Sequence, residues 1–168
     1  MIRTLLCSAV LLAGAGVAAE ATAATASTTF QVTASVEKTC RIEAVSSLAF
    51  GNYDPTSDTA ATGTGTIRVR CTTGTIAPIA LNQGVNRSGD TTCVNRAMKS
   101  AASDELSYGL YQATGATTAW GCAAGTNTYS YTAANASWNN LTVHGVIPAA
   151  QTAPIGAYTD TVTATITF

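Results

Sequence analysis

The chain has 168 residues, of which 46% are hydrophobic and only 10% are charged, and its formal net charge at pH 7 is −1. This length suits a single domain with one core. The sequence contains no run of Lys or Arg, which excludes a strongly basic nucleic-acid surface. Its richness in Thr, Ala, Ser and Gly favours an extracellular β protein.

The first stretch is typical of a secretory signal peptide. Arg3 is followed by an uncharged, Leu- and Ala-rich run over 4–19, and small-residue sites end at positions 19 and 23. We therefore expect residues 1–23 to be the signal, with cleavage near 19 to 23. Removal of Arg3 leaves seven basic and nine acidic residues, a net charge of about −2. The run is shorter than the roughly 20 residues of a membrane anchor. Cys7 follows Leu6 instead of a small residue, and most of the apolar run lies after it, so we expect Cys7 to be discarded with the signal.

A Thr- and Ala-rich tether and an amphipathic strand occupy residues 24–37. The apolar positions of this strand are Phe30, Val32, Ala34 and Val36, and polar residues alternate with them. A side-chain period of two gives a strand one buried and one solvated face.

Short strand-like segments, separated by turn signals, fill the middle of the chain. They cover 40–50, 65–72, 76–82, 97–99, 106–112, 128–131 and 141–147. Many short strands in a chain of this size predict an antiparallel β-sandwich.

The last predicted strand covers 157–168 and is amphipathic as well. Its apolar positions are Val162, Ala164, Ile166 and Phe168, and Thr residues alternate with them. Two amphipathic strands thus bracket the chain. This arrangement indicates a sheet whose edge is completed by another polypeptide, which is an assembly function rather than a catalytic one.

Four cysteines remain after the signal, and we expect them to form two disulfides. They are Cys40, Cys71, Cys93 and Cys122, and four cysteines allow three pairings. We favour Cys40 with Cys71, because Cys71 continues the apolar face of a strand, as a bridge between core strands requires. We favour Cys93 with Cys122, because both lie in Gly- and Asn-rich loops. A metal site would need paired spacings such as CxxC, which do not occur.

The sequence offers little for catalysis. The single histidine, His144, lies on the polar face of a strand, which favours a solvated side chain over a general base. No phosphate-binding loop, metal motif or Gly-x-Ser-x-Gly elbow occurs. We therefore expect neither enzyme activity nor a cofactor or metal. Calcium binding by loop carboxylates is a weaker alternative; the carboxylates in question are Asp54, Asp58, Asp90, Asp104 and Glu105.

Several motifs, taken in chain order, resemble the spore coat protein U domain family. They are FQVTASVEKTC (30–40), LAFGNYDP (48–55), VRCT (69–72), RAM (96–98), LSYGLY (106–111), WG (120–121), HGVIP (144–148), Gln151 and GAYTDTV with the residues after it (156–168). No single motif is specific, but together they cover nearly all of the chain after the signal.

The resemblance implies a subunit of archaic, Csu-type chaperone-usher pili, which serve adhesion and biofilm formation. Such subunits have an immunoglobulin-like β-sandwich that lacks one strand, so an apolar groove stays open. A periplasmic chaperone fills the groove during transport. At the outer-membrane usher, the N-terminal extension of the next pilin subunit replaces the chaperone.

The resemblance also implies roles for the two bracketing strands. Phe30, Val32, Ala34 and Val36 fit the donor strand, and Val162, Ala164, Ile166 and Phe168 fit the strand that borders the acceptor groove. Residues 38–168 would be the pilin domain. A bridge between Cys93 and Cys122 is not general in the family. Tip adhesins carry a second, receptor-binding domain, so this shorter chain is expected to be a shaft or adaptor subunit.

Two other non-enzymatic functions are alternatives. The first is a secreted coat protein that self-associates on a spore or cell surface. The second is a carbohydrate-binding adhesin module, which would need Trp120, Trp138 and Tyr131 on one exposed face; with Tyr129, these aromatic residues are more often core or loop anchors in a small sandwich.

Overall fold

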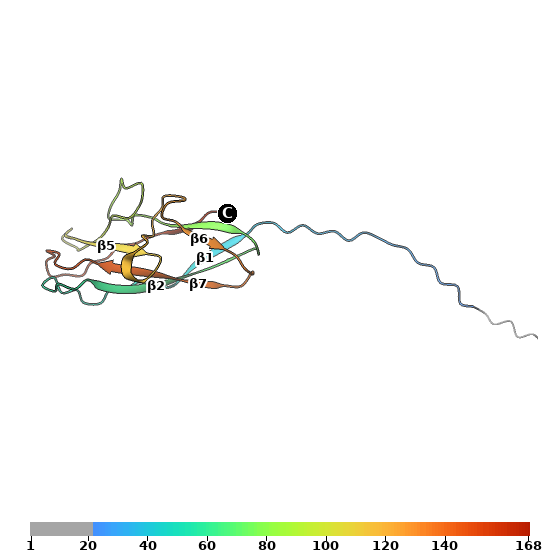
Figure 1. Cartoon of the computed structure of the whole chain (residues 1–168), viewed down its shortest axis with the longest axis horizontal. Helices are drawn as coiled ribbons and strands as arrows, with labels where there is room; N and C mark the ends of the chain where they lie inside the picture. The colour runs from blue at the N-terminus through green and yellow to red at the C-terminus, as the bar shows by residue number, and fades with distance from the viewer. Residues whose placement is uncertain (1–21) are drawn as a thin grey trace, which may run out of the picture. The chain divides into compact units, whose positions relative to one another are not determined.

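The computed structural model describes residues 22–168 of the chain (Figure 1). The described residues divide into a segment that ends at Ser35 and a compact unit, Val36–Phe168. Of the predicted signal peptide at 1–23, residues 1–21 lie outside the described part. Residues 22–39 belong to no strand or helix, so the strand expected at 30–36 is not formed in the isolated chain. A strand needs a hydrogen-bonded neighbour, and this segment has none here.

The compact unit is built almost entirely from β-strands, as predicted. The elements found in residues 22–168 are β1 (Cys40–Ser46), β2 (Ala61–Cys71), β3 (Ile76–Leu81), β4 (Arg96–Lys99), β5 (Glu105–Tyr111), a 3-10 turn η1 (Thr114–Ala116), β6 (Tyr129–Thr132), β7 (Asn139–Ile147) and β8 (Ala164–Ile166). Each predicted internal strand has a counterpart, with ends that differ by a few residues.

Two antiparallel sheets make up the sandwich. The larger has the order β1-β2-β7-β5-β4, and the smaller has the order β6-β3-β8; β1, β2, β7 and β5 can be followed in Figure 1. Along β2 the residues Gly65, Ile67, Val69 and Cys71 are buried, whereas the residues between them are partly exposed. This alternation places one face of each sheet on the shared core, and the predicted all-β, immunoglobulin-like class is confirmed.

The core is centred on Trp120, which is completely buried. Its indole N–H donates a 2.8 Å hydrogen bond to the backbone oxygen of Ile79 in β3. Its ring stacks on Tyr129 of β6 with ring centroids 5.1 Å apart. A buried Trp with a satisfied N–H both fills the core and fixes the smaller sheet.

The disulfides that join Cys40 to Cys71 and Cys93 to Cys122 are both present. Cys40 and Cys71 lie directly opposite each other at one end of the β1–β2 ladder. The second bridge joins the loop before β4 to the loop before β6. Both favoured pairings are therefore found.

The largest differences from the predicted strands lie at β1 and at the C-terminus. β1 ends at Ser46 instead of at residue 50, because a register shift between Ala44 and Ser46 interrupts its ladder. The final strand, expected over 157–168, is reduced to Ala164–Ile166, which pairs with β3. Before it, Thr159 forms only an isolated bridge with Lys99 at the end of β4.

Candidate functional site

Among the strand edges that no other strand covers within residues 22–168, those of β1 and β8 lie near each other. β1 is the terminal strand of the larger sheet, and β8 is a terminal strand of the smaller one. Within residues 22–168, no strand pairs with the outer edge of either. The β4 end of the larger sheet differs, because Lys99 and Thr159 exchange backbone hydrogen bonds of 3.0 and 3.1 Å. Bare edges are templates for pairing with another chain.

Two neighbouring cavities lie over the inner face of the larger sheet, and the first of them lies beside the β1 and β8 edges. We call them together the edge groove. The first has a volume of about 480 Å³, and its lining includes Ala44 and Ser46 of β1, Gly65 and Ile67 of β2, and Val162 and Ala164 near the C-terminus. The second has a volume of about 880 Å³ and is lined by residues that include Met98, Leu106, Ile147, Ala153 and Tyr158. Leu48, Phe50, Met98 and Tyr158 line both cavities, so the two adjoin each other at these side chains.

Leu48 and Phe50 lie on a strip of glycines at the floor of the edge groove. A Cβ atom placed on Gly145 of β7 would lie 2.7 Å from Phe50 Cζ and 2.8 Å from the Leu48 methyl carbons. A Cβ on Gly65 of β2 would lie 3.1 Å from Leu48 Cβ. These glycines are needed for close approach rather than for an unusual backbone conformation. The segment after β1 therefore covers part of the inner face without filling it.

Asp160 holds the C-terminal segment in place at the point where this segment leaves the edge of β4 and reaches the edge of β3. Its carboxylate accepts hydrogen bonds from the Tyr108 hydroxyl at 2.6 Å, the Val85 backbone N–H at 2.9 Å and the Asn86 side-chain amide at 3.1 Å. Burial and then the hydrogen bond to Asp160 raise the pKa of Tyr108 well above its ordinary value, so the phenol remains a donor. This polar contact thus braces one wall of the edge groove.

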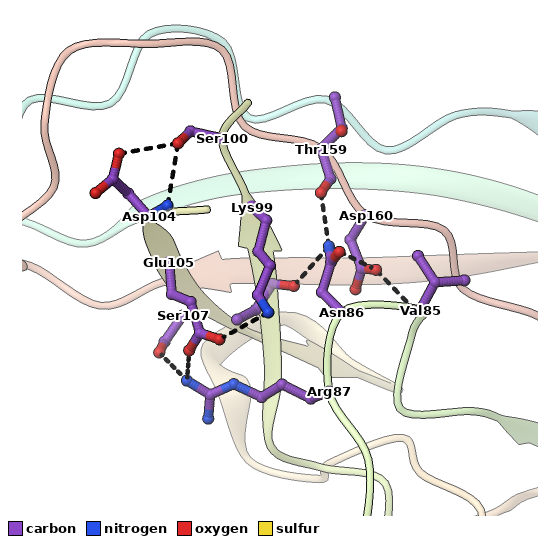
Figure 2. A network of polar contacts seen from close by, with 11 residues as sticks. Val85, Asn86, Arg87, Lys99, Ser100, Asp104, Glu105, Ser107, Thr159 and Asp160 are labelled. Carbon is purple, nitrogen blue, oxygen red and sulfur yellow. Dashed lines mark hydrogen bonds and ion pairs between the residues drawn. The ribbon is translucent and has the colours of Figure 1, made fainter. Parts of the chain in front are cut away.

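Asn86 joins the same segment to the larger sheet (Figure 2). Its side-chain amide also donates to the backbone oxygens of Ala97, at 3.1 Å, and Thr159, at 2.8 Å. The next residue, Arg87, forms a 2.7 Å ion pair with Glu105 at the start of β5, and Lys99 contacts Glu105 from β4 at 3.4 Å. The loop between β3 and β4 is therefore fastened on both sides.

Arg96 is a buried cation that the sequence did not single out for a role. Only 1% of the residue is exposed. Its guanidinium donates 2.9 Å hydrogen bonds to the backbone oxygens of Leu81, Asn82 and Trp120. Burial lowers its pKa. These carbonyls lie 14 to 24 residues away in the sequence, so they could not be identified from the sequence, and Arg96 serves to join the two sheets.

The four residues expected to border the groove differ in their environments. Val162 and Ala164 line the first cavity, and Ile166 packs against the core opposite Ile79. Phe168 is 54% exposed and lines neither cavity. The structure thus places the first three along one wall of the sandwich interior and leaves Phe168 beyond the end of β8.

The four residues expected in the donor strand are all exposed. The exposed fractions are 85% for Phe30, 81% for Val32 and 84% for Val36, and Ala34 is exposed as well. Exposing large apolar side chains to water costs free energy, and a row of them on an extended segment is typical of a surface that another molecule covers. The side chains are therefore available for pairing outside this chain.

The alternative sites find little support. Trp120 and Tyr131 are buried, so the exposed aromatic platform expected for a carbohydrate-binding module does not exist. His144 is half-buried on the outer face of β7, opposite Thr64 of β2. Within residues 22–168, no three His, Cys, Asp or Glu side chains lie close enough to hold a metal ion together. The same residues include no helix long and apolar enough to cross a membrane.

Comparison with known proteins links this geometry to one family. Residues 26–165 match the model of the "Spore Coat Protein U domain". The chain is 38% identical over 159 residues to "Protein U" of Myxococcus xanthus, and the match covers 88% of each chain.

Among solved structures, the chain resembles one in the complex of CsuC with CsuE, the chaperone and tip adhesion subunit of archaic chaperone-usher Csu pili of Acinetobacter baumannii. The TM-score is 0.55 and the identity is 27%. The match covers 79% of this chain but only 40% of the solved one, so this chain spans less than half of the relative's length.

Proposed function

Since this chain belongs to the spore coat protein U domain family, we propose that it is a structural subunit of a surface pilus assembled by the chaperone-usher pathway. The main observation behind this proposal is the edge groove, which lies beside the bare edges of β1 and β8. The N-terminal segment of the same chain presents an unpaired apolar face. The likeness to a chaperone-bound pilus subunit supports the proposal at the level of fold and partner class.

In this proposal, subunits join by donor-strand exchange. The apolar face of one subunit's segment, formed by Phe30, Val32, Ala34 and Val36, enters the edge groove of the next subunit. A strand inserted there could hydrogen-bond to the outer edges of both β1 and β8. Val162, Ala164 and Ile166 would contact the inserted side chains, and Phe168 would be covered at the end of β8. An extended strand that pairs on both sides suits a groove between two sheets.

The proposal defines the partners and the location of the protein. A periplasmic chaperone would cover the groove during transport, an outer-membrane usher would exchange it for the next subunit, and the fibre would stand on the cell surface. Export requires the signal expected at 1–23. The fibre would serve adhesion and biofilm formation, and the subunit would carry out no chemical reaction.

A second candidate is a secreted coat protein that self-associates without forming a pilus. The description of the matching family as a spore coat protein U domain favours it. The two functions share the fold and differ in the product of assembly. Electron microscopy of producing cells, with and without the gene, distinguishes them: thin surface fibres that disappear with the gene support the pilus, whereas an amorphous layer that disappears supports the coat.

A further inference from the structure

A group of arginines marks one end of the larger sheet, which we call the Cys71 end. Arg41 of β1 lies directly opposite Arg70 of β2, and Arg68 lies on the same outer face two residues away. The centroid of the Trp138 ring lies 4.6 Å from the guanidinium carbon of Arg68 and 4.7 Å from that of Arg70. Stacking on an indole restrains guanidinium groups and leaves their N–H donors available.

This arrangement costs stability unless an anion compensates it. Like charges directly opposite each other in a sheet repel. Arg68 is paired with Glu43 at 2.7 Å, but within residues 22–168 neither Arg41 nor Arg70 has a carboxylate within ion-pair distance. The two cations are therefore suited to an acidic group on another molecule.

The opposite end of the larger sheet, which we call the Ala61 end, is acidic. It carries Asp54 and Asp58 in the loop before β2, together with Asp104 and Glu105 at the start of β5. The hydroxyl and backbone N–H of Thr56 hold the pKa of Asp54 below its usual range, so this carboxylate stays ionised. Glu105 is paired with Arg87 and Lys99. Within the described residues, Asp54 and Asp58 have no cation within ion-pair distance.

The two ends are separated by the length of β2. Its 11 residues run from the acidic to the basic end, a distance of roughly 33 Å at 3.3 Å per residue. Charges that far apart are screened from each other at physiological salt, where the Debye length is about 8 Å. The attraction between the two ends therefore contributes little to the stability of the isolated domain, and the charges at each end are available for contacts with another molecule.

Chain connectivity relates these ends to assembly. The donor segment leaves from the Cys71 end, where the Thr72 hydroxyl donates to the Glu37 backbone oxygen at 2.9 Å and accepts from the Thr39 N–H at 3.1 Å. Only three residues separate Val36 from Cys40, so a subunit that receives the donor lies directly beyond this end. The larger cavity of the edge groove is lined by Pro55 and Ile147, at the Ala61 end.

We propose that the basic Cys71 end of one copy docks on the acidic Ala61 end of the next copy along the fibre. This inference rests on donor-strand exchange as the proposed mode of assembly. The partner surface is the Ala61 end of a second copy of this chain. The donor segment of one copy leaves from its basic Cys71 end, and the larger cavity of the receiving copy lies at its acidic Ala61 end. The contact steers and orients successive subunits, whereas the donor strand supplies the lasting junction.

A charge exchange between the two ends tests the inference. Arg41→Glu and Asp58→Lys each reverse one exposed charge whose side chain makes no hydrogen bond or ion pair within the described residues. The double variant keeps the net charge of the unmodified protein. Each exported protein is purified and unfolded, then diluted from denaturant at 20 mM and at 500 mM NaCl. The growth of heat-resistant multimers is followed on gels.

We expect each single variant to assemble roughly tenfold more slowly than the unmodified protein at low salt, and the double variant to recover most of that rate. At high salt all four proteins should assemble at similar rates. Equal rates at low salt, or a double variant slower than either single variant, would overturn the docking and leave donor-strand exchange standing. Absence of multimers from the unmodified protein at both salt concentrations would overturn both.

Discussion

The Tyr108 hydroxyl and the Asp160 carboxylate are joined by a 2.6 Å hydrogen bond. This bond connects β5, in the larger sheet, to the C-terminal segment, which runs from the edge of β4 to the edge of β3. Both residues line the first cavity of the edge groove. The lining of this cavity therefore includes a polar contact, which holds the C-terminal segment against the larger sheet.

Replacing Asp160 by Ala should destabilise the domain by about 2 to 4 kcal/mol, because the partly buried donors of Tyr108 and Asn86 and the exposed backbone N–H of Val85 lose this acceptor. Urea unfolding at pH 7 measures the change. The matched control is Asp58→Ala, which removes an exposed carboxylate with no hydrogen bond within the described residues and should change stability by less than about 0.5 kcal/mol. Similar losses for the two variants would show that Asp160 does not brace the segment.

Replacing Tyr108 by Phe should change how stability depends on alkaline pH. Burial, and then the bond to Asp160, raise the pKa of Tyr108 above its ordinary value of 10.0. The unfolded chain therefore loses this proton first, and the stability contributed by the group is present below about pH 10 and is lost as the pH rises beyond it. Unfolding free energies measured from pH 8 upward should fall less steeply above pH 10 in the variant. An identical slope in the two proteins would contradict this assignment.

The strands whose residues alternate clearly could be predicted from the sequence. In β2, β5 and β7 every second residue faces the core, and packing on a second sheet decides the class of fold. The 30–36 segment carries the same pattern but is unpaired, and the 157–168 segment pairs on one side, mainly with β3. Alternation specifies which side chains can be buried together; it does not specify whether a partner strand belongs to the same chain.

The floor of the groove and its polar brace could not be predicted. Leu48 and Phe50 were expected to continue a strand, whereas a register shift ends β1 at Ser46 and directs them onto Gly145 and Gly65. Asp160 acts through Tyr108, which lies 52 residues away. Contacts across such distances depend on the whole topology, and no local propensity reports them.

Replacing Gly145 by Ala should disturb the floor of the groove. The added methyl would lie 2.7 Å from Phe50 Cζ, so Phe50 and Leu48 must move, at a cost of about 1 to 3 kcal/mol. Thermal unfolding measures the loss. Gly156→Ala is the control, because its Cβ would find its nearest neighbour at 3.8 Å and its backbone does not require glycine. A variant at Gly145 as stable as this control would mean that the Leu48–Phe50 segment is not packed on the glycines.

Replacing His144 by Ala should leave both folding and assembly intact. The side chain lies on the outer face of β7, away from the edge groove, and takes part in no hydrogen bond or ion pair identified within residues 22–168. Stability should change by less than about 0.5 kcal/mol. Multimer formation on gels and urea unfolding measure the two effects. Loss of assembly in this variant would place an essential contact on the outer face of the larger sheet.

Replacing Val32 by Asp should abolish assembly into fibres. If Phe30, Val32 and Val36 enter a neighbouring groove, burial of these side chains contributes roughly 5 to 9 kcal/mol, and backbone hydrogen bonds along two strand edges add to it. A carboxylate in the middle of that face must lose its water without gaining a partner, which opposes insertion by several kcal/mol. The variant should still be exported and should still offer its own groove to a chaperone.

Thr33→Asp is the matched control, because it adds the same charge on the opposite face of the same segment. Heat-resistant ladders on gels and fibres in electron micrographs should disappear for Val32→Asp and persist for Thr33→Asp. If both variants polymerise equally well, the alternating face of the segment does not enter a groove. Donor-strand exchange through residues 30–36 would then be wrong, and the self-associating coat protein would become the better explanation of the chain.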